Sequence, residues 1–223
     1  MEKIIAVKEW SLAIRINHWA MAIAIFILIP TGFYIASPFT VGAGETVNKF
    51  LMGNMRFIHI LFGMILVFIF LWRIYLAFFS KFHADWKDFF AWMDMKAIIH
   101  QIKFYLHLEK HPPEQKWLYG PVQSLAYAGL LFMVLVIVVT GLILMGAGYH
   151  AGLTALLYKI VKPVENAMGG LATVRFVHHV FTWFFILFIV VHIYMAFWYD
   201  VMLHKGTVSS MISGRVFKRV VEE

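Results

Sequence analysis

The chain has 223 residues, of which 62% are hydrophobic and only 14% are charged, with a formal net charge of +7 and no cysteine. A soluble domain is nearer half apolar and a quarter charged, so this composition predicts an integral membrane protein. The lack of cysteine excludes disulfides, iron–sulfur clusters held by thiolates, thiolate zinc sites and covalently attached c-type haem. Nucleic-acid binding is not expected, because the basic residues fall at the ends of the apolar segments and in loops.

Four apolar segments are long enough to cross a hydrocarbon core of about 30 Å, which takes roughly 20 residues of helix. In chain order they are residues 16–36, 57–79, 122–145 and 176–199. They predict an all-α fold, in which residues 1–223 form one membrane domain built as a four-helix transmembrane bundle. The first segment lacks a small-residue cleavage site, so we expect it to span the membrane rather than to be removed as a signal peptide.

Three stretches between the spans also have distinct patterns. Residues 95–108 carry apolar residues at helical spacing, which indicates an interfacial amphipathic helix or a surface helix packed on the bundle. Residues 145–152 and 168–170 are rich in glycine, and we expect turns there, in the loop between the third and fourth spans.

The distribution of positive charge predicts the orientation of the spans. Of the 19 Lys and Arg residues, fourteen lie on the side of the two termini and the 80–120 loop. The other five lie on the side of the two remaining loops. Because positive residues accumulate in the cytoplasm, both termini are predicted to be cytoplasmic.

Four histidines lie in or just inside the predicted spans, where ionisable groups are costly and usually functional. They are His18, His59, His178 or its neighbour His179, and His192. His178 and His192 are 14 residues apart, which places them on one face of a helix and about 21 Å apart along its axis. His179 is 13 residues from His192 and points away from it, so His178 is the preferred candidate.

The direction of each span sorts these histidines by depth. His18 begins the first span at the cytoplasmic level, whereas His59 begins the second span at the outer level. In the returning fourth span, His178 is at the outer level and His192 is deeper. The pairs His59 with His178 and His18 with His192 each supply the two axial imidazoles of a bis-histidine haem, so two b haems are predicted.

The same four histidines are compatible with two arrangements that contain no haem. All four could be core residues whose hydrogen bonds are satisfied within the bundle. A metal ion without haem is the weaker alternative, because zinc would require more ligands at one level and no cysteine or carboxylate is present there.

Arginines accompany these histidines at regular spacings. Arg15, Arg56 and Arg175 each precede a histidine by three residues, and Arg73 follows His59 by 14. Such arginines can bind haem propionates bidentately, or they can simply reach lipid head groups.

Glycines also follow the histidines at helical spacings. Gly32 lies 14 residues after His18, Gly63 lies one turn after His59, and Gly141 lies in the third span. These glycines can let a flat macrocycle approach the backbone, or they can serve close helix packing.

Several motifs are specific in combination. They are Arg15-Ile-Asn-His18-Trp19, Thr31-Gly32, Tyr119-Gly-Pro-Val-Gln123, Arg175-Phe-Val-His178-His179, Trp183, Phe188, HIYMAFW and GTVSSMISGRV. Over nearly its whole length the chain therefore resembles the b-type cytochrome subunit of membrane-bound nickel–iron hydrogenases. The HIYMAFW motif is shared with the cytochrome b subunit of membrane-bound formate dehydrogenase, which is the alternative; a haem-free membrane anchor or small transporter is the second alternative.

The resemblance implies a role in the cytoplasmic membrane of a prokaryote. The outer haem would receive electrons from an iron–sulfur cluster of the hydrogenase small subunit, which accompanies the large subunit and packs its C-terminal helix on the cytochrome. The inner haem would reduce a quinone, either menaquinone or ubiquinone. By the same resemblance His18, His59, His178 and His192 are the axial ligands, and the chain activates no hydrogen itself.

One position departs from the family pattern. Relatives often have Asn where this chain has Gly120, just before the third span. If that Asn binds quinone in relatives, another group must do so here, and Tyr119 and Gln123 are the candidates.

Overall fold

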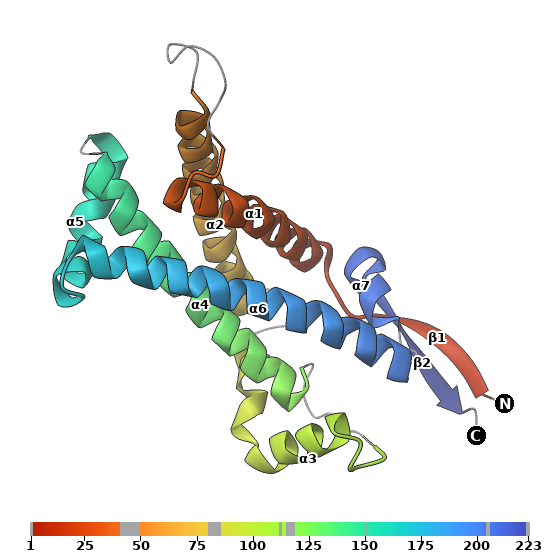
Figure 1. Ribbon diagram of the computed structural model, residues 1–223. Helices are drawn as coiled ribbons and strands as arrows, with labels where there is room; N and C mark the ends of the chain where they lie inside the picture. Colours follow the sequence, from red (N-terminus) through yellow and green to blue (C-terminus); the bar gives the residue numbers. More distant parts are fainter. Residues whose placement is uncertain are drawn as a thin grey trace. The chain divides into compact units, whose positions relative to one another are not determined.

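A computed structural model of the chain describes residues 2–40, 50–79, 86–111, 113–114, 119–149, 151–203 and 206–221 (Figure 1). Four of its helices are long and apolar enough to cross a membrane: α1 (Leu12–Ala36), α2 (Leu51–Phe79), α4 (Pro121–Gly148) and α6 (Leu171–Leu203). The prediction of an all-α fold with four spans is confirmed, and each of the four helices begins before the span predicted for it.

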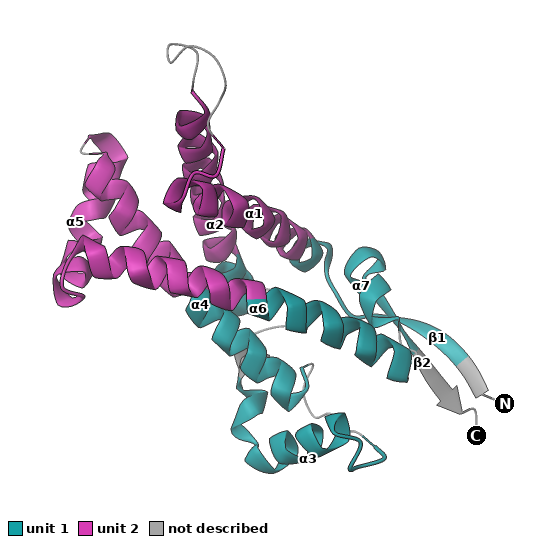
Figure 2. Ribbon diagram, in the orientation of Figure 1, with its two compact units in different colours: residues 1–15, 73–133, 187–223 teal, residues 16–72, 134–186 magenta. Residues whose placement is uncertain are grey.

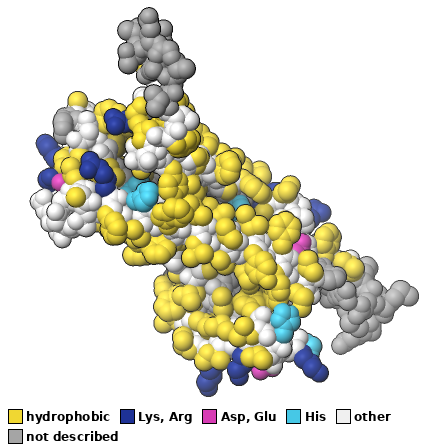
Figure 3. Space-filling view, viewed as in Figure 1, with side chains coloured by type: hydrophobic (Ala, Val, Ile, Leu, Met, Phe, Trp, Pro, Cys, Tyr) yellow, Lys and Arg dark blue, Asp and Glu magenta, His cyan; other side chains and the backbone are white. Residues whose placement is uncertain are grey.

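The surfaces of the four long helices are apolar. Most of their residues are not buried in the chain, and exposed Phe, Leu and Ile side chains recur along each of them. Hydrophobic side chains cover most of the face shown in Figure 3. Contiguous apolar surface of this extent requires a nonpolar environment, which a bilayer supplies.

Shorter elements lie before, between and after the long helices. They are β1 (Glu2–Lys8), the 3₁₀ helix η2 (Trp86–Met93), α3 (Met95–Tyr105), α5 (Gly152–Ala167), α7 (Thr207–Ser213) and β2 (Arg215–Val221). Helix α3 begins at the first residue of the predicted 95–108 helix. Helix α5 was not predicted. The turn expected over residues 145–152 is wrong for Met145–Gly148, which are the last residues of α4, whereas residues 168–170 form a turn as expected.

The chain divides into two compact units, coloured separately in Figure 2. Unit 1 contains residues 1–15, 73–133 and 187–223, and unit 2 contains residues 16–72 and 134–186. Each of the four long helices contributes one part to unit 1 and another to unit 2.

In unit 1, the two ends of the chain pair with each other. Strand β1 is antiparallel to β2, with Glu2 opposite Val221 and Lys8 opposite Arg215. Next to the strands, the Trp10 indole N–H donates to Ser210 Oγ of α7 at 3.1 Å, and both residues are buried. The two ends of the chain thus lie side by side, which is compatible with four spans between them.

Also in unit 1, α3 packs on the C-terminal part of α6. Asp94 caps α3, because its carboxylate accepts from the Ala97 amide at 3.0 Å. Phe104 and Tyr105 lie edge-on to Trp198 of α6, with ring centroids 5.8 and 5.3 Å away. One face of α3 is therefore packed on the protein, as in the surface-helix interpretation of this segment. Burial raises the pKa of Tyr105 to about 12.

In unit 2, α5 is packed against α4 and the start of α6. Ile143, Val161 and Val174 are buried together, one from each helix. Gly146 permits close approach of α5, since a Cβ at this position would lie 2.5 Å from Tyr158 Cβ.

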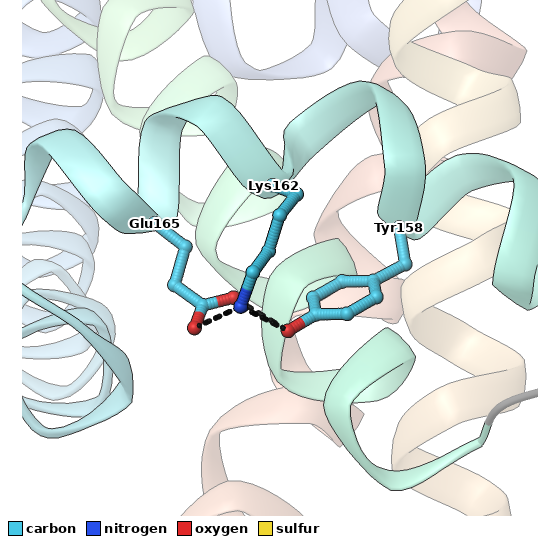
Figure 4. A network of polar contacts seen from close by, with 3 residues as sticks. All are labelled: Tyr158, Lys162 and Glu165. Carbon is cyan, nitrogen blue, oxygen red and sulfur yellow. Dashed lines mark hydrogen bonds and ion pairs between the residues drawn. The ribbon is translucent and has the colours of Figure 1, made fainter.

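A polar network lies on α5 itself, shown in Figure 4. The Tyr158 hydroxyl donates to Glu165 Oε2 at 2.7 Å, and Lys162 Nζ donates to Glu165 Oε1 at 2.8 Å. Lys162 lowers the pKa of the Glu165 carboxyl, and the Tyr158 hydroxyl lowers it further. This network satisfies the acidic side chain, which is buried against the protein.

Candidate haem site

Unit 2 contains a cavity to which all four long helices contribute. Its empty volume is about 750 Å³, part of it open at the surface. The lining side chains are aliphatic or aromatic apart from His59, Thr182 and His178. A pocket of this kind, mostly apolar with a few polar groups, suits an organic cofactor.

His59 of α2 and His178 of α6 face each other in this cavity. Their ring centroids are 6.4 Å apart, and the ring planes are inclined by 67°. Two imidazoles that bind one metal ion from opposite sides, with nitrogen–metal distances of about 2.0–2.1 Å, have centroids roughly 6 Å apart. The spacing of these two rings therefore fits a shared metal ion between them.

The Nδ1 atom of each ring is held by a threonine from another helix. Thr31 Oγ1 of α1 lies 3.0 Å from His59 Nδ1, and Thr140 Oγ1 of α4 lies 2.9 Å from His178 Nδ1. Both threonines are buried. Nε2 is therefore the ring nitrogen that remains for a ligand in both histidines.

Two glycines leave space for the imidazole rings of His59 and His178. A Cβ at Gly32 would lie 3.0 Å from His59 Cε1, and a Cβ at Gly141 would lie 3.4 Å from His178 Cε1. Gly63 lines the cavity, and a Cβ there would meet nothing within 4 Å. Gly32 and Gly141 thus accommodate an imidazole, a function that neither sequence interpretation of these glycines included.

These features together fit a haem b. His59 and His178 would bind the iron through Nε2, and the apolar side chains of the four helices would surround the macrocycle. The structure thus brings together two of the four predicted ligands in unit 2.

Of the His178-His179 doublet, only the first histidine lines the cavity. The ring of His179 lies edge-on to Phe33 at 5.3 Å and to Trp183 at 6.5 Å. His179 therefore packs against one residue of α1 and one of its own helix.

The other predicted pair is divided between the units. His18 is half-buried in unit 2, with its ring edge-on to Trp19 at 5.2 Å. His192 is half-buried in unit 1, where its ring stacks on Phe188 at 5.5 Å with planes 10° apart. The pairing of His18 with His192 stays a prediction.

The four arginines differ in their surroundings. Arg56 and Arg175 are exposed, one helical turn before His59 and His178. Arg15 Nη1 donates to the Ile212 carbonyl of α7 within unit 1.

The Nε–H group of Arg15 differs from its Nη1, which has a partner. Its Nε is buried with no hydrogen-bond partner among the described residues, so this donor fits an acceptor such as a propionate. Arg73 is half-buried in unit 1.

The two quinone candidates lie in a cluster of aromatic rings in unit 1. Tyr119 is buried, stacks on Trp10 at 6.0 Å and meets the ring of Tyr127 edge-on at 4.7 Å. Gln123 is exposed, and its side-chain amide donates to the Tyr127 hydroxyl at 3.0 Å. Gln123 is therefore the more accessible of the two.

The sequence reasoning missed the role of Thr140 and named Thr31 only as part of a motif. A signal was present, because the dipeptide Thr-Gly occurs at Thr31-Gly32 and again at Thr140-Gly141. Each dipeptide lies on one helix and faces a histidine on another, which no spacing along a single helix can reveal.

A bundle of membrane helices that presents two facing imidazoles in an apolar cavity defines a b-type membrane cytochrome. The profile of the family described as prokaryotic cytochrome b561 matches residues 9–214, and the chain belongs to this family. It is therefore a multi-pass membrane protein that binds haem b.

Several relatives are similar over most of their length. The chain is 32% identical to the probable Ni/Fe-hydrogenase B-type cytochrome subunit of Bradyrhizobium diazoefficiens, across 90% of this chain and 82% of that protein. Identity to the protein of the same description from Rhodobacter capsulatus is 33%, across 92% and 79%. The probable Ni/Fe-hydrogenase 1 B-type cytochrome subunit of Escherichia coli K12 is 26% identical, across 90% and 86%.

Proposed function

We propose that the chain is the membrane electron-transfer subunit of a nickel–iron hydrogenase and carries electrons through two b haems to a quinone. The observation that carries this proposal is the facing pair His59 and His178 in an apolar cavity between the spans. The similarity to Ni/Fe-hydrogenase B-type cytochrome subunits supports a hydrogenase partner over a formate dehydrogenase.

In the first site, His59 and His178 are the axial ligands. These two imidazoles would hold a haem that supplies one-electron transfer without a change of ligands. The apolar lining excludes water and so influences the reduction potential. Arg56 and Arg175, one turn before the ligands, bind the propionates.

In the second site, His18 and His192 are the axial ligands, as the family resemblance implies. Arg15 and Arg73 are its propionate partners, and the buried Nε of Arg15 supports that assignment. Because His192 follows His178 by 14 residues on the continuous helix α6, the two sites lie at different depths of the membrane.

The orientation follows from charge. The side with the two termini and fourteen of the Lys and Arg residues is cytoplasmic, in the inner membrane of a prokaryote. The hydrogenase small subunit, with its iron–sulfur clusters and C-terminal membrane helix, docks on the opposite side together with the large subunit. Electrons therefore enter near His59 and His178 and leave on the cytoplasmic side.

The quinone binds near the cytoplasmic end of the spans and is reduced by two electrons and two protons. Gly120 supplies no side chain just before the third span, so Gln123 and Tyr119 are the candidates to contact the quinone. Gln123 already has a hydrogen-bond partner in Tyr127, so quinone binding would compete with or extend this contact.

The test is a pyridine haemochrome assay with a reduced-minus-oxidised spectrum, on the complex purified from membranes. We expect two b haems per chain, one of which is lost in His18→Ala. Copurification of hydrogenase subunits confirms the partner, whereas copurification of a formate dehydrogenase contradicts it. A well-folded preparation without haem would overturn the proposal and leave an anchor or a transporter.

A further inference from the structure

We propose that Thr31 and Thr140 are positioning residues that hold His59 and His178 in the same tautomer, with the proton on Nδ1, and thereby lower the reduction potential of the haem between them. The proposal rests on the proposed function of the two histidines as axial ligands. It adds two residues that are outside the cavity lining but control how the imidazoles would donate to the iron.

The contacts of Thr31 show which way its hydroxyl proton points. Thr31 Oγ1 lies 2.8 Å from the Ile27 carbonyl oxygen and 3.1 Å from that of Leu28, both in the preceding turn of α1. A hydroxyl has one proton to donate and two lone pairs to accept with. If it donates to the backbone carbonyl, it accepts from His59, so the proton of the ring is on Nδ1.

Thr140 repeats this arrangement on α4. Its Oγ1 lies 2.7 Å from the Val136 carbonyl oxygen, 3.2 Å from that of Ile137, and 2.9 Å from His178 Nδ1. The two threonines thus have three partners of the same kinds: the carbonyl four residues earlier, the carbonyl three residues earlier, and an imidazole from another helix.

The opposite tautomer is disfavoured by the cavity. With the proton on Nε2, each ring would present a donor to a lining whose only other polar side chain is Thr182. Thr182 Oγ1 already donates to the backbone carbonyl of His178 at 3.0 Å. An unsatisfied buried donor is destabilising, so the Nδ1–H form, which leaves a lone pair on Nε2, is the stable one.

The hydrogen bond has a consequence at the metal. A partner that accepts from the second ring nitrogen raises the basicity of a metal-ligating imidazole and fixes its orientation. Since the oxidised iron carries more positive charge, a more basic ligand stabilises it and lowers the reduction potential. Thr31 and Thr140 act on opposite ligands, so their effects should be similar in size and sign.

The glycine after each threonine completes the arrangement. Gly32 lies against Cε1 of His59, and Gly141 lies against Cε1 of His178, the ring carbon between the two nitrogens. The hydroxyl of each Thr-Gly pair holds Nδ1, and the absent side chain leaves space for the ring. The Thr-Gly dipeptide therefore has the same arrangement against both histidines.

The experiment compares the midpoint potentials of the two haems in the purified complex for Thr31→Val, Thr140→Val and Thr182→Val. Valine keeps the shape of threonine and removes the hydroxyl. Thr182→Val is the matched control, because Thr182 lines the same cavity but bonds only to backbone. Thr31→Ser and Thr140→Ser retain the hydroxyl.

We expect one haem potential to rise in both Thr31→Val and Thr140→Val, with Thr182→Val and the two serine variants unchanged. Loss of such a partner typically costs roughly 10–100-fold in metal affinity or activity. We expect a change of roughly tenfold in the relative stability of oxidised and reduced iron. A tenfold change in the reduced-to-oxidised ratio corresponds to about 59 mV for one electron. If a valine variant loses haem, restoration of both haem and potential by serine supports the same conclusion.

Unchanged potentials in both valine variants overturn the proposal, as does a serine variant that shifts like valine. A shift of equal size in Thr182→Val also overturns it, because that result indicates a general effect on the cavity. These outcomes leave the two-haem function intact. Failure of the function itself appears separately, as absence of haem in the unmodified complex.

Discussion

Buried polar contacts serve different ends in the two units. In unit 2, the hydroxyls of Thr31 and Thr140 are directed at two histidine rings, whose other nitrogens have no comparable partner in the cavity lining. In unit 1, the contacts around Trp10 and Arg15 are with Ser210 and the Ile212 carbonyl, and they join the two ends of the chain. The role of a polar residue in this protein therefore follows from the atom that it contacts and not from its sequence distance to a histidine.

The largest effect is expected in unit 2, when the space beside the His59 imidazole is reduced. Gly32→Val places a branched side chain where a single Cβ would already lie 3.0 Å from His59 Cε1. We expect loss of one b haem per chain, because the imidazole cannot keep its position. Haem content of the purified complex measures this effect.

The matched control is Gly53→Ala, which lies on α2 outside the lining of this cavity and adds a Cβ with nothing within 4 Å. It should retain both haems. Equal haem loss in the two variants would show that the position of His59 is not what Gly32 protects.

The next effect concerns the arginines, which share a motif but differ in their contacts with the rest of the protein. Arg15→Gln removes the donor to the Ile212 carbonyl in unit 1, and hydrogen bonds to charged groups contribute about 1.5–3 kcal/mol. We expect lower thermal stability in detergent. The exposed Arg56, substituted in the same way, should leave stability unchanged and alter only the haem spectrum or potential. Equal destabilisation by the two changes would contradict the distinction.

A packing contact within unit 2 comes third. Gly146→Ala adds a Cβ only 2.5 Å from Tyr158 Cβ, so α5 must move away from α4. Overpacking of this kind costs about 1–3 kcal/mol, and thermal unfolding should show it. Gly129→Ala in the same helix meets nothing within 4 Å and should not destabilise the protein. Haem content should fall less than in Gly32→Val.

The smallest effect is a dependence on pH at α5. The contacts of Lys162 and Tyr158 lower the pKa of Glu165 below its ordinary value of 4.5. Such a group contributes stability that is present above pH 4.5 and is lost as the pH falls through the lowered pKa. The unfolding temperature of Glu165→Gln should therefore approach that of the unmodified protein as the pH decreases from about 6 to about 3. A constant difference over this range would contradict the ion pair.

The sequence predicted the elements that a local pattern defines. Four long apolar segments can hardly be anything but spans, and the apolar spacing of residues 95–108 predicted α3 from its first residue. Helix α5 was missed because glycines flank it and Pro163 interrupts it, which favours a loop on local evidence alone. The pairing of β1 with β2 joins residues at opposite ends of the chain, and no local pattern specifies it.

The site was likewise predicted where a pattern within one helix defines it. Spacing and span direction paired His59 with His178, and their facing rings agree with that pairing. The threonine partners depend on which faces of α1 and α4 meet the histidines, and this information is tertiary. Only the repeated Thr-Gly dipeptide hinted at them.

The most direct test of the shared haem site counts haem in His59→Ala, in His178→Ala and in the variant with both changes, with His179→Ala as the control. If the two histidines share one haem, each single variant loses one b haem per chain and the double variant loses no more. His179→Ala should keep both haems, since His179 packs with Phe33 and Trp183. Retention of both haems in either single variant, or loss of a second haem in the double variant, would contradict the shared site.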